Sequence, residues 1–487
     1  MSNWVEPSEG SPGAGAARLP GPPRERHWTM NVLLVGTGTV GEAIAHLIKG
    51  KKWLGTLTLA DYSLDRARTV ADAVGAGYKV AQVDAGNAAQ LKELIASSKA
   101  DLVLNAVDPR FVPAVFDAAL EAGVHYIDMA TSLSIPDATN PYTVPGLMLG
   151  AYQEERKKLW EDRGKLALIG MGMDPGLSNI FAAYAKKWTF DDISAVHVRD
   201  GGDLRIEGYP FATVFSLWTV IEECLNPPIV WRNGKIEVRE PFSEPEDFVF
   251  PEGVGPVMCV NVEHEEVVQL PRSMKADVIT FKYALGADFI ETLQLLHRLG
   301  LDGKNPINVK GVQVAPRDVI GALSPDQSTL GKSMIGRAIV GTLVSGTKDG
   351  RPRETFHYQV CDAAETMGRY NLQPVAWQTG VMPVMAMELI AEGVWSGAGV
   401  KSPDMMDPDP FLDICEDYDV TVKLEHRLPG RSILPATEQP PVGAKSVTVK
   451  GSSSPTDTAY SAAATAALSA PVSYPETESE RQGRGGR

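Results

Sequence analysis

Short apolar runs alternate with stretches of helical period from residue 30 to about residue 172. Residues 32–35, 57–60 and 101–105 form the apolar runs, and the stretches after them repeat apolar positions at helical spacing. Strands that alternate with helices predict a parallel sheet with helices on its faces. We therefore expect an α/β domain over residues 29–172.

The pattern changes after residue 190. Alternating apolar and polar positions flank Asn233-Gly234 and Asp349-Gly350, and such pairs favour tight turns between antiparallel strands. Helical stretches, for example at residues 215–224, lie between these predicted hairpins. The mixture predicts an α+β domain over residues 173–365, to which we assign substrate binding and dimerisation.

The two ends of the chain differ from the middle. Helical stretches at residues 377–393 and 408–418 are the last with regular apolar spacing. Residues 1–28 and 429–487 are rich in Pro, Gly, Ser and Ala, which predicts a disordered leader and a disordered tail. The leader has no apolar core of the kind that a secretory signal needs.

A glycine-rich turn follows the first apolar run. Residues 36–41 read Gly-Thr-Gly-Thr-Val-Gly, and Asp61 ends the next run 20 residues after Gly41. In a Rossmann domain these glycines permit a tight turn, close approach of a diphosphate and packing of helix on strand, while the acid binds the adenosine ribose. A glycine-rich turn that binds nothing is the alternative, but the strand before it and the helix after it favour a dinucleotide site.

The predicted cofactor site extends beyond this turn. Residues 105–107 follow a buried strand, where ligands of α/β sheets bind. Asp84 ends the third strand-like run and either approaches adenine or caps the next helix. The Asp61 carboxylate would repel a 2′-phosphate, so we expect NAD, with NADP possible because Arg66 and Arg68 lie nearby. The predicted cofactor-binding residues are Gly36, Thr37, Gly38, Thr39, Val40, Gly41, Asp61, Asp84, Asn105, Ala106 and Val107.

Two further aspartates follow predicted strands. Asp128 shares a strand face with Tyr126. Asp174 and Pro175 fit the N-cap and first position of a helix expected at residues 180–188. In the other interpretation, this second helix N-terminus faces the first across a crevice and brings Asp174 close to the reactive ring of the cofactor. The sequence leaves both interpretations open.

Composition excludes several classes of protein. The formal net charge of −15 argues against nucleic acid or an anionic membrane as a partner. No apolar run approaches the ~18 residues of a membrane span. The four cysteines are far apart in the sequence, which predicts neither a metal site nor disulfides. We expect free buried thiols in a reducing cytoplasm.

The order and spacing of the motifs resemble those of the saccharopine dehydrogenase family, which includes glutamate-forming saccharopine reductases, lysine 6-dehydrogenases and carboxynorspermidine dehydrogenases. The resemblance covers residues 30 to about 427. It rests on the glycine turn, residues 105–107, Gly123-Val-His-Tyr-Ile-Asp128, Gly172-Met-Asp174-Pro175-Gly176, Gly201-Gly202, Asn233-Gly234-Lys235, Gln378-Thr379-Gly380, Gly399-Val400 and Asp407-Pro408-Asp409-Pro410-Phe411.

The resemblance implies a Rossmann domain interrupted by an α+β substrate domain, with the helices of residues 366–428 returning to the first domain. It implies hydride transfer between NAD(P) and a carbon that bears nitrogen, on a small amine or amino-acid substrate, in a homodimer. Asp174 would line the substrate pocket, and Ser132 would lie near the nicotinamide. The other substrate positions that it implies are Asp200, Gly201, Gly202, Phe215, Trp218 and His264.

Oxidation of an amine needs a neutral nitrogen, which a general base can provide. The candidates for this catalytic role are Asp174, His264 and Asp128. A surface position for His264 and a backbone-bonded strand end for Asp128 are the alternatives.

The substrate stays open at this stage. The acidic residues suit a cationic, saccharopine- or lysine-type amine. Glutamate-forming saccharopine reductases place an arginine near residues 263–265, whereas the nearest arginine here is Arg272. A carboxynorspermidine-type imine reductase, or an NAD-binding sensor or scaffold without turnover, are therefore the alternatives.

Overall fold

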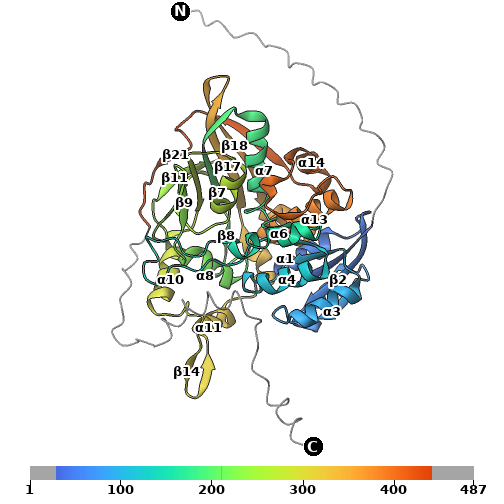
Figure 1. Cartoon of the computed structure of the whole chain (residues 1–487). Helices are drawn as coiled ribbons and strands as arrows, with labels where there is room; N and C mark the ends of the chain where they lie inside the picture. The colour runs from blue at the N-terminus through green and yellow to red at the C-terminus, as the bar shows by residue number, and fades with distance from the viewer. Residues whose placement is uncertain (1–28, 210, 441–487) are drawn as a thin grey trace, which may run out of the picture.

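The structure is a computed structural model that describes residues 29–209 and 211–440. The predicted leader and residues 441–487 of the predicted tail lie outside the described residues. Two large sheets, each with helices around it, form the body of the molecule (Figure 1).

The first sheet is parallel throughout, as the strand–helix pattern predicts. Its strand order is β19-β6-β5-β4-β1-β2-β3, and its pairings are parallel. The chain moves outward from β1 in one direction and then restarts at β4 on the other side, so the strand order reverses between β1 and β4. Ligands of open α/β sheets bind beyond the carboxyl ends of strands at such a point. The strands are β1 (Met30–Val35), β2 (Leu54–Asp61), β3 (Lys79–Gln82), β4 (Leu102–Asn105), β5 (His125–Asp128), β6 (Leu166–Leu168) and β19 (Gly399–Lys401).

Helices cover both faces of this sheet. Their ends follow local signals: Ser63 caps the second helix through the backbone N–H of Arg66, and Gly75 and Gly123 end two helices in the left-handed conformation. The helices are α1 (Thr39–Leu47), α2 (Leu64–Val74), α3 (Ala88–Ser98), α4 (Val112–Ala122), α5 (Ala151–Glu154) and α6 (Lys157–Asp162). Residues 151–162 thus form two short helices instead of one continuous helix.

The second sheet is mixed, in the order β20-β18-β17-β7-β13-β12-β11-β21. Both predicted hairpins are present, and their turn residues Asn233, Gly234, Asp349 and Gly350 have positive φ. The strands are β7 (Asp192–Gly202), β9 (Ile229–Arg232), β10 (Lys235–Val238), β11 (Glu246–Phe250), β12 (Gly255–Asn261), β13 (Val278–Tyr283), β17 (Arg337–Lys348), β18 (Arg351–Asp362), β20 (Val422–Arg427) and β21 (Ile433–Pro435). The helices of this half are α7 (Leu177–Tyr184), α8 (Leu217–Leu225), α9 (Glu266–Ser273), α10 (Ala287–Arg298) and α12 (Ala363–Tyr370).

The chain after residue 365 serves both halves. Helix α13 (Pro374–Ala391) packs on α1, where a Cβ added to Gly380 would lie 3.2 Å from the Cβ of Ala43. After α13, β19 joins the first sheet and α14 (Pro408–Asp413) follows. The interrupted Rossmann architecture is therefore present.

Two boundaries differ from the prediction. Residues 366–428 do not return only to the first domain, because β20 pairs with β18 of the second sheet. The tail predicted from residue 429 begins too early, since β21 pairs with β11. The short alternating stretches gave too little signal to mark either strand.

An excursion leaves the second half between α10 and β17. It contains a small hairpin, β14 (Ile307–Val309) and β15 (Val312–Val314), then α11 (Pro316–Leu323) and the 3₁₀ segment η3 (Gln327–Ser333). The hairpin extends away from the body (Figure 1). Its return path brings residues 326–328 to the main cavity.

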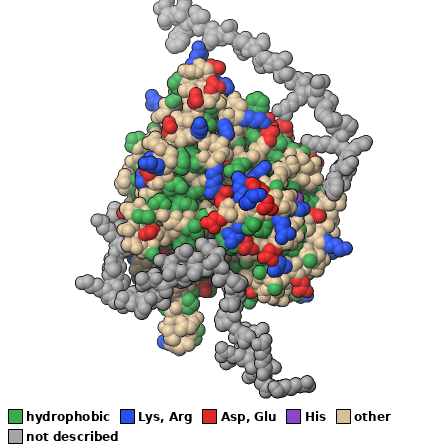
Figure 2. Space-filling model, viewed as in Figure 1, with side chains coloured by type: hydrophobic (Ala, Val, Ile, Leu, Met, Phe, Trp, Pro, Cys, Tyr) green, Lys and Arg blue, Asp and Glu red, His purple; other side chains and the backbone are tan. Residues whose placement is uncertain are grey.

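The surface also differs between the halves. In Figure 2, acidic and basic side chains are interspersed over the half that carries α6 and α13, while apolar side chains gather over the large mixed sheet. In the part of the chain that the structure describes, no helix combines the length and apolarity that crossing a membrane requires.

Candidate active site

A cavity of about 480 Å³ lies where the two halves meet, beyond the carboxyl ends of β1 and β4. One wall belongs to the parallel sheet and the other to the mixed sheet and its helices. The first wall comprises Gly36, Gly38, Thr39, Val40, Asp61, Arg66, Asn105, Ala106, Val107, Asp108, Pro109, Met129 and Ala130. The second comprises Asp174, Asp200, Phe215, Ser216, Thr219, Glu223, His264, Tyr283, Asp326, Gln327, Ser328, Val375 and Thr379.

The glycine turn leaves the space that a dinucleotide requires. Gly36 has φ +99°, and an added Cβ would lie 2.5 Å from the carbonyl oxygen of Ala106. A Cβ on Gly41 would lie 2.1 Å from the carbonyl oxygen of Gly36. Gly38 is exposed to the cavity, and its Cβ would meet only open space. The first and third glycines therefore permit close packing, while the second leaves room for a diphosphate at the N-terminus of α1.

Asp61 lines the cavity at the end of β2, as predicted. Its Oδ2 accepts hydrogen bonds of 2.8 Å from both the backbone N–H and the hydroxyl of Thr37, and its Oδ1 accepts one from the Ser63 N–H. Arg66 donates from Nε to the Thr37 carbonyl and pairs with Glu42. Thr37, predicted to bind the cofactor, is buried and does not line the cavity; its N–H and hydroxyl hold Asp61 against the turn.

The remaining predicted cofactor residues divide into two groups. Residues 105–107 line the cavity. Asp84 does not, because it is an exposed residue whose carboxylate accepts a hydrogen bond from the Gly86 N–H. The cap of α3 is Asn87, so neither interpretation of Asp84 matches its position.

Asp128 and Ser132 also lie away from the cavity lining. The Asp128 carboxylate accepts hydrogen bonds from the Tyr126 hydroxyl, the Gln153 amide and the Gly170 N–H. Burial raises its pKa to about 7, although these hydrogen bonds oppose the rise. The Ser132 N–H donates to Gln153. These contacts support the backbone-bonded alternative for Asp128 and give Ser132 a structural position.

Asp174 lines the cavity and is not the N-cap of a helix, contrary to the capping interpretation. The N-cap of α7 is Gly176, at φ +138°, whose N–H donates to the Asn179 side chain. A Cβ on Gly176 would lie 1.8 Å from the Gly172 carbonyl oxygen. Because the chain doubles back on itself here, Asp174 stands in the loop before the helix and lines the cavity.

Ionisable side chains cluster around Asp174 on the second wall of the cavity. Burial and the neighbouring Asp200 carboxyl raise the pKa of Asp174. Burial raises the pKa of Asp200 to about 7, partly offset by His264 and by hydrogen bonding from Tyr283. Burial also raises the pKa of Glu223 to about 8. The Asp200 and Glu223 carboxyls therefore exchange protons near neutral pH, which is what general acid–base catalysis needs.

His264 is buried beside this cluster. Its ring stacks on Phe281 with centroids 3.5 Å apart, and its Nδ1 lies 2.5 Å from the Glu266 carboxylate. Burial alone would lower the pKa of His264, but Glu266, Glu265 and Asp174 outweigh it and hold the pKa well above its usual value. A histidine that is protonated at neutral pH is a proton donor or a fixed cation, and does not suit the general-base role considered for it.

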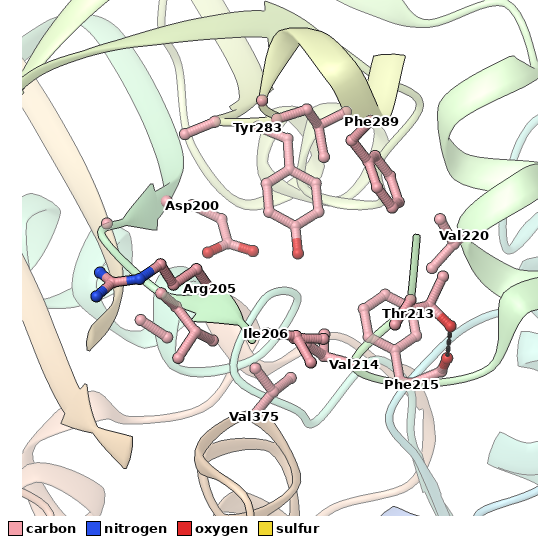
Figure 3. A pocket seen from close by; sticks show the side chains of 18 of the residues that line it. Asp200, Arg205, Ile206, Thr213, Val214, Phe215, Val220, Tyr283, Phe289 and Val375 are labelled. Atoms are coloured by element: carbon pink, nitrogen blue, oxygen red, sulfur yellow. Dashed lines mark hydrogen bonds between the residues drawn. The ribbon is translucent and has the colours of Figure 1, made fainter. Parts of the chain in front are cut away.

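A second chamber of about 300 Å³ opens from the same cluster. Asp174, Asp200 and Tyr283 line both spaces, and Asp200 and Tyr283 face each other at the junction (Figure 3). Polar and apolar surfaces contribute about equally to its wall, and the Phe211 and Phe289 rings stack there with centroids 5.0 Å apart. The predicted Gly201, Gly202 and Phe215 line this chamber. Trp218 lines neither space.

Several lining residues were not predicted, and for some the sequence carried a signal. Ser216, the N-cap of α8, and Thr219 and Glu223 within the helix are spaced three and four apart, so they form a polar stripe along one side of α8. Tyr283 is the parallel neighbour of Asp200 in the sheet, which only the strand register reveals. Residues 326–328 carried no recognisable signal.

Across residues 29–209 and 211–440, no His, Cys, Asp and Glu side chains are grouped as a metal would require. The four cysteines are buried and free.

Comparison with known proteins identifies the family. Residues 32–168 match the saccharopine dehydrogenase NADP binding domain, and residues 172–420 match the saccharopine dehydrogenase C-terminal domain. A carboxynorspermidine synthase of Vibrio alginolyticus is 28% identical over 418 residues, which are 83% of this chain and 99% of that relative. A carboxyaminopropylagmatine dehydrogenase of Synechocystis sp. is 29% identical over 385 residues, covering 78% and 94%.

A solved structure shares the fold. Apo saccharopine dehydrogenase (L-Glu forming) from Saccharomyces cerevisiae aligns with a TM-score of 0.60 at 16% identity, over 82% of this chain and 100% of that one. The chain therefore belongs to the saccharopine dehydrogenase family and is an NAD(P)-binding oxidoreductase that acts on a carbon–nitrogen group.

Proposed function

We propose that this enzyme transfers a hydride between NAD(P) and the carbon of a C–N bond in a polyamine-type amine that carries a carboxylate. The observation that carries this proposal is the excess of carboxyl groups on the second wall of the cavity. Asp174, Asp200 and Glu223 line the cavity there, and a cationic amine would compensate their charge as they ionise.

The junction of the two spaces supports a reaction at a C–N bond. Asp174, Asp200 and Tyr283 line both the cofactor cavity and the second chamber, so an amine nitrogen held by these residues lies where the two spaces meet, with its substituents in the second chamber. The names of the two relatives, a carboxynorspermidine synthase and a carboxyaminopropylagmatine dehydrogenase, also describe carboxylated polyamines.

The protein groups have distinct tasks in this proposal. Bound NAD(P) supplies or accepts the hydride. In the oxidising direction, a carboxylate of the cluster removes the proton from the ammonium form of the substrate, because only the neutral nitrogen can assist loss of hydride from its carbon. His264, held as a cation by Glu266, favours the ionised form of the neighbouring Asp174 and Asp200 carboxyls and so opposes the effect of their burial. The resulting imine is then hydrolysed by water.

A saccharopine-type substrate is less well accommodated. Its glutamyl carboxylates need cationic partners, and Arg272, the nearest arginine to His264 in the sequence, pairs with Glu154 instead of lining either chamber. Arg205 lines the second chamber, where its side chain is largely exposed and makes a long contact of 3.8 Å with the Glu207 carboxylate. It offers a place for one substrate carboxylate, which fits a singly carboxylated polyamine.

The test compares substrates under one assay. Carboxynorspermidine, carboxyaminopropylagmatine, saccharopine and lysine are each incubated with NAD⁺ and with NADP⁺, and the absorbance of reduced cofactor is followed. We expect kcat/KM for a carboxylated polyamine to exceed that for saccharopine and lysine by about 100-fold, the range that a buried charge partner provides. A preference for saccharopine or lysine would refute the substrate assignment, and cofactor binding without any turnover would favour the sensor.

Asp174→Asn tests the site itself. The amide cannot accept a proton at working pH, so kcat should fall about 10²- to 10⁴-fold while cofactor binding stays unchanged. The amide has nearly the same size as the carboxyl, so the loop before α7 should keep its conformation. A variant that retains wild-type kcat would remove Asp174 from the mechanism.

A further inference from the structure

Trp218, expected in the substrate pocket, instead lies between two arginines from different parts of the chain. The guanidinium carbon of Arg110 lies 3.8 Å from the centroid of the Trp218 ring, and that of Arg317 lies 4.6 Å from it. Guanidinium groups bind aromatic faces in this range by cation–π attraction. We call this group the Arg110–Trp218–Arg317 stack.

The first arginine belongs to the cofactor wall. Arg110 follows directly after Asp108 and Pro109, both of which line the cavity, and its Nε donates to Asp108 Oδ1 at 2.9 Å. The other oxygen of Asp108 accepts a long hydrogen bond of 3.5 Å from the Ser216 hydroxyl on α8. Asp108 is therefore held between the turn after β4 and the helix that carries Trp218.

The second arginine belongs to the excursion that reaches the cavity from the other side. Arg317 lies in the first turn of α11, is 4% exposed, and is fixed by the Glu222 carboxylate and the Asp302 carbonyl. Two residues separate the end of helix α11 from Asp326, Gln327 and Ser328, which line the cavity. Anchoring α11 thus determines where these cavity residues lie.

We propose that Trp218 is a positioning residue for NAD(P): the Arg110–Trp218–Arg317 stack joins the turn at residues 108–109 to the segment at residues 326–328 and so holds the cofactor cavity closed. Trp218 touches neither cofactor nor substrate in this role, because it lines neither chamber. The proposal concerns NAD(P) binding and does not depend on the identity of the amine.

Two properties of the stack explain why it suits closure better than a salt bridge. Its contacts are made between a ring face and guanidinium groups, with no hydrogen bond that fixes their relative position, so moving Arg110 off the ring breaks no buried ion pair. Arg110 retains considerable exposure, with 38% of its side-chain surface accessible, and can leave the ring for water at low cost. Arg317 stays with its buried carboxylate partner, so opening should occur on the Arg110 side.

The experiment measures the Kd of NADH and NADPH by fluorescence titration of the full-length protein without substrate. Trp218→Leu removes the aromatic face and should raise Kd about tenfold, while Trp218→Phe keeps a face and should stay within about threefold of wild type. Trp188→Leu is the matched control, since Trp188 is another partly exposed tryptophan, 53% exposed, that lines neither chamber. It should leave Kd unchanged.

Two further measurements keep the result unambiguous. Arg110→Ala alters an exposed side chain, so it should fold normally and raise Kd about threefold, and combining it with Trp218→Leu should add nothing. Hydrogen exchange should show that NADPH protects residues 324–333 in wild type and not in Trp218→Leu. Equal Kd values in wild type, Trp218→Leu and Arg110→Ala, or unchanged protection in Trp218→Leu, would overturn the proposal.

Discussion

The two walls of the active-site cavity are built on different principles. The cofactor wall comes from turns at the ends of neighbouring parallel strands, and its main property is backbone that approaches closely, as at Gly36 and Gly41. The substrate wall collects side chains from separate segments: Asp174 before α7, Asp200 near the end of β7 and Glu223 on α8. Its main property is charge.

This difference predicts different responses to change. The cofactor wall should fail when backbone space is lost, at any pH, because its contacts are made by N–H groups that do not titrate. The substrate wall should tolerate changes of similar size and respond to pH, because its carboxyls have pKa values shifted toward neutrality. The predictions below test this contrast, from the largest expected effect to the smallest.

Gly41→Ala should have the largest effect. The added Cβ would lie 2.1 Å from the Gly36 carbonyl oxygen and 2.9 Å from the Gly36 carbonyl carbon, and these backbone atoms cannot move aside as the end of a flexible side chain could. We expect the Kd of NADH and NADPH to rise at least about 100-fold, with a lower melting temperature. Isothermal titration calorimetry and thermal unfolding measure both quantities.

Gly38→Ala is the control within the same turn. Its Cβ meets only open space, so the melting temperature should stay within about 2 °C of wild type while cofactor affinity falls about tenfold. If both alanine variants bind cofactor as tightly as wild type, the cofactor wall does not depend on close backbone packing and the contrast is wrong.

Glu223→Gln should change the pH profile more than the maximal rate. The pKa of Glu223 is raised to about 8 by burial, so below pH 7 the wild-type carboxyl is protonated and resembles the amide. Above pH 8 it is ionised and attracts a cationic substrate. We expect the KM of the variant for the amine to equal that of wild type near pH 6 and to be about tenfold higher at pH 9.

The ionisation of Glu223 should also lower the stability of the substrate-free protein as the pH rises, whereas it strengthens the binding of a cationic substrate. A carboxyl whose folded pKa is raised contributes stability below its unfolded pKa of 4.5, and this contribution is lost as the pH rises through about 8. The substrate-free wild type should therefore lose more thermal stability between pH 5 and pH 9 than Glu223→Gln. If the melting temperatures of the two proteins fall by the same amount between pH 5 and pH 9, the raised pKa assigned to Glu223 is contradicted.

The same contrast explains what the sequence could and could not reveal. The cofactor wall is encoded locally: the spacing of the glycine turn and Asp61, and the place of residues 105–107 after a strand, predict a shared site, and the structure brings these residues to one cavity. The substrate wall is assembled by sheet register and by helix α8, so the sequence does not single out Glu223, which lies in an expected helix, or Tyr283, which ends β13. Asp174 was recognised through resemblance, while its loop conformation depends on Gly176 folding back on Gly172, a contact that helix-capping rules do not describe.

Cofactor choice should show a smaller effect, because it depends on the rim of the cofactor wall. Asp61 already accepts three hydrogen bonds from the protein, and Arg66 lines the cavity beside it. If NADP is accepted, Arg66 is the cation that meets its 2′-phosphate, and Arg66→Ala should weaken NADPH about fivefold to tenfold more than NADH. Equal losses for the two cofactors would assign Arg66 to supporting the Thr37 turn only, through its bond to the Thr37 carbonyl.

Asp128→Asn should have the smallest effect on catalysis. It tests whether a buried carboxyl with a shifted pKa affects the reaction when it does not line the cavity. Asp128 has a pKa of about 7, like Asp200, yet it lines neither chamber and accepts three hydrogen bonds from Tyr126, Gln153 and Gly170. The amide replaces one accepting oxygen with a donor, which leaves at least one buried partner unsatisfied and should lower the melting temperature by several degrees. For the protein that remains folded, kcat/KM and its pH dependence should stay within about twofold of wild type. A loss of activity as large as that of Asp174→Asn, with unchanged stability, would show that a shifted pKa matters here without direct access to the cavity, and would remove the distinction between the two walls.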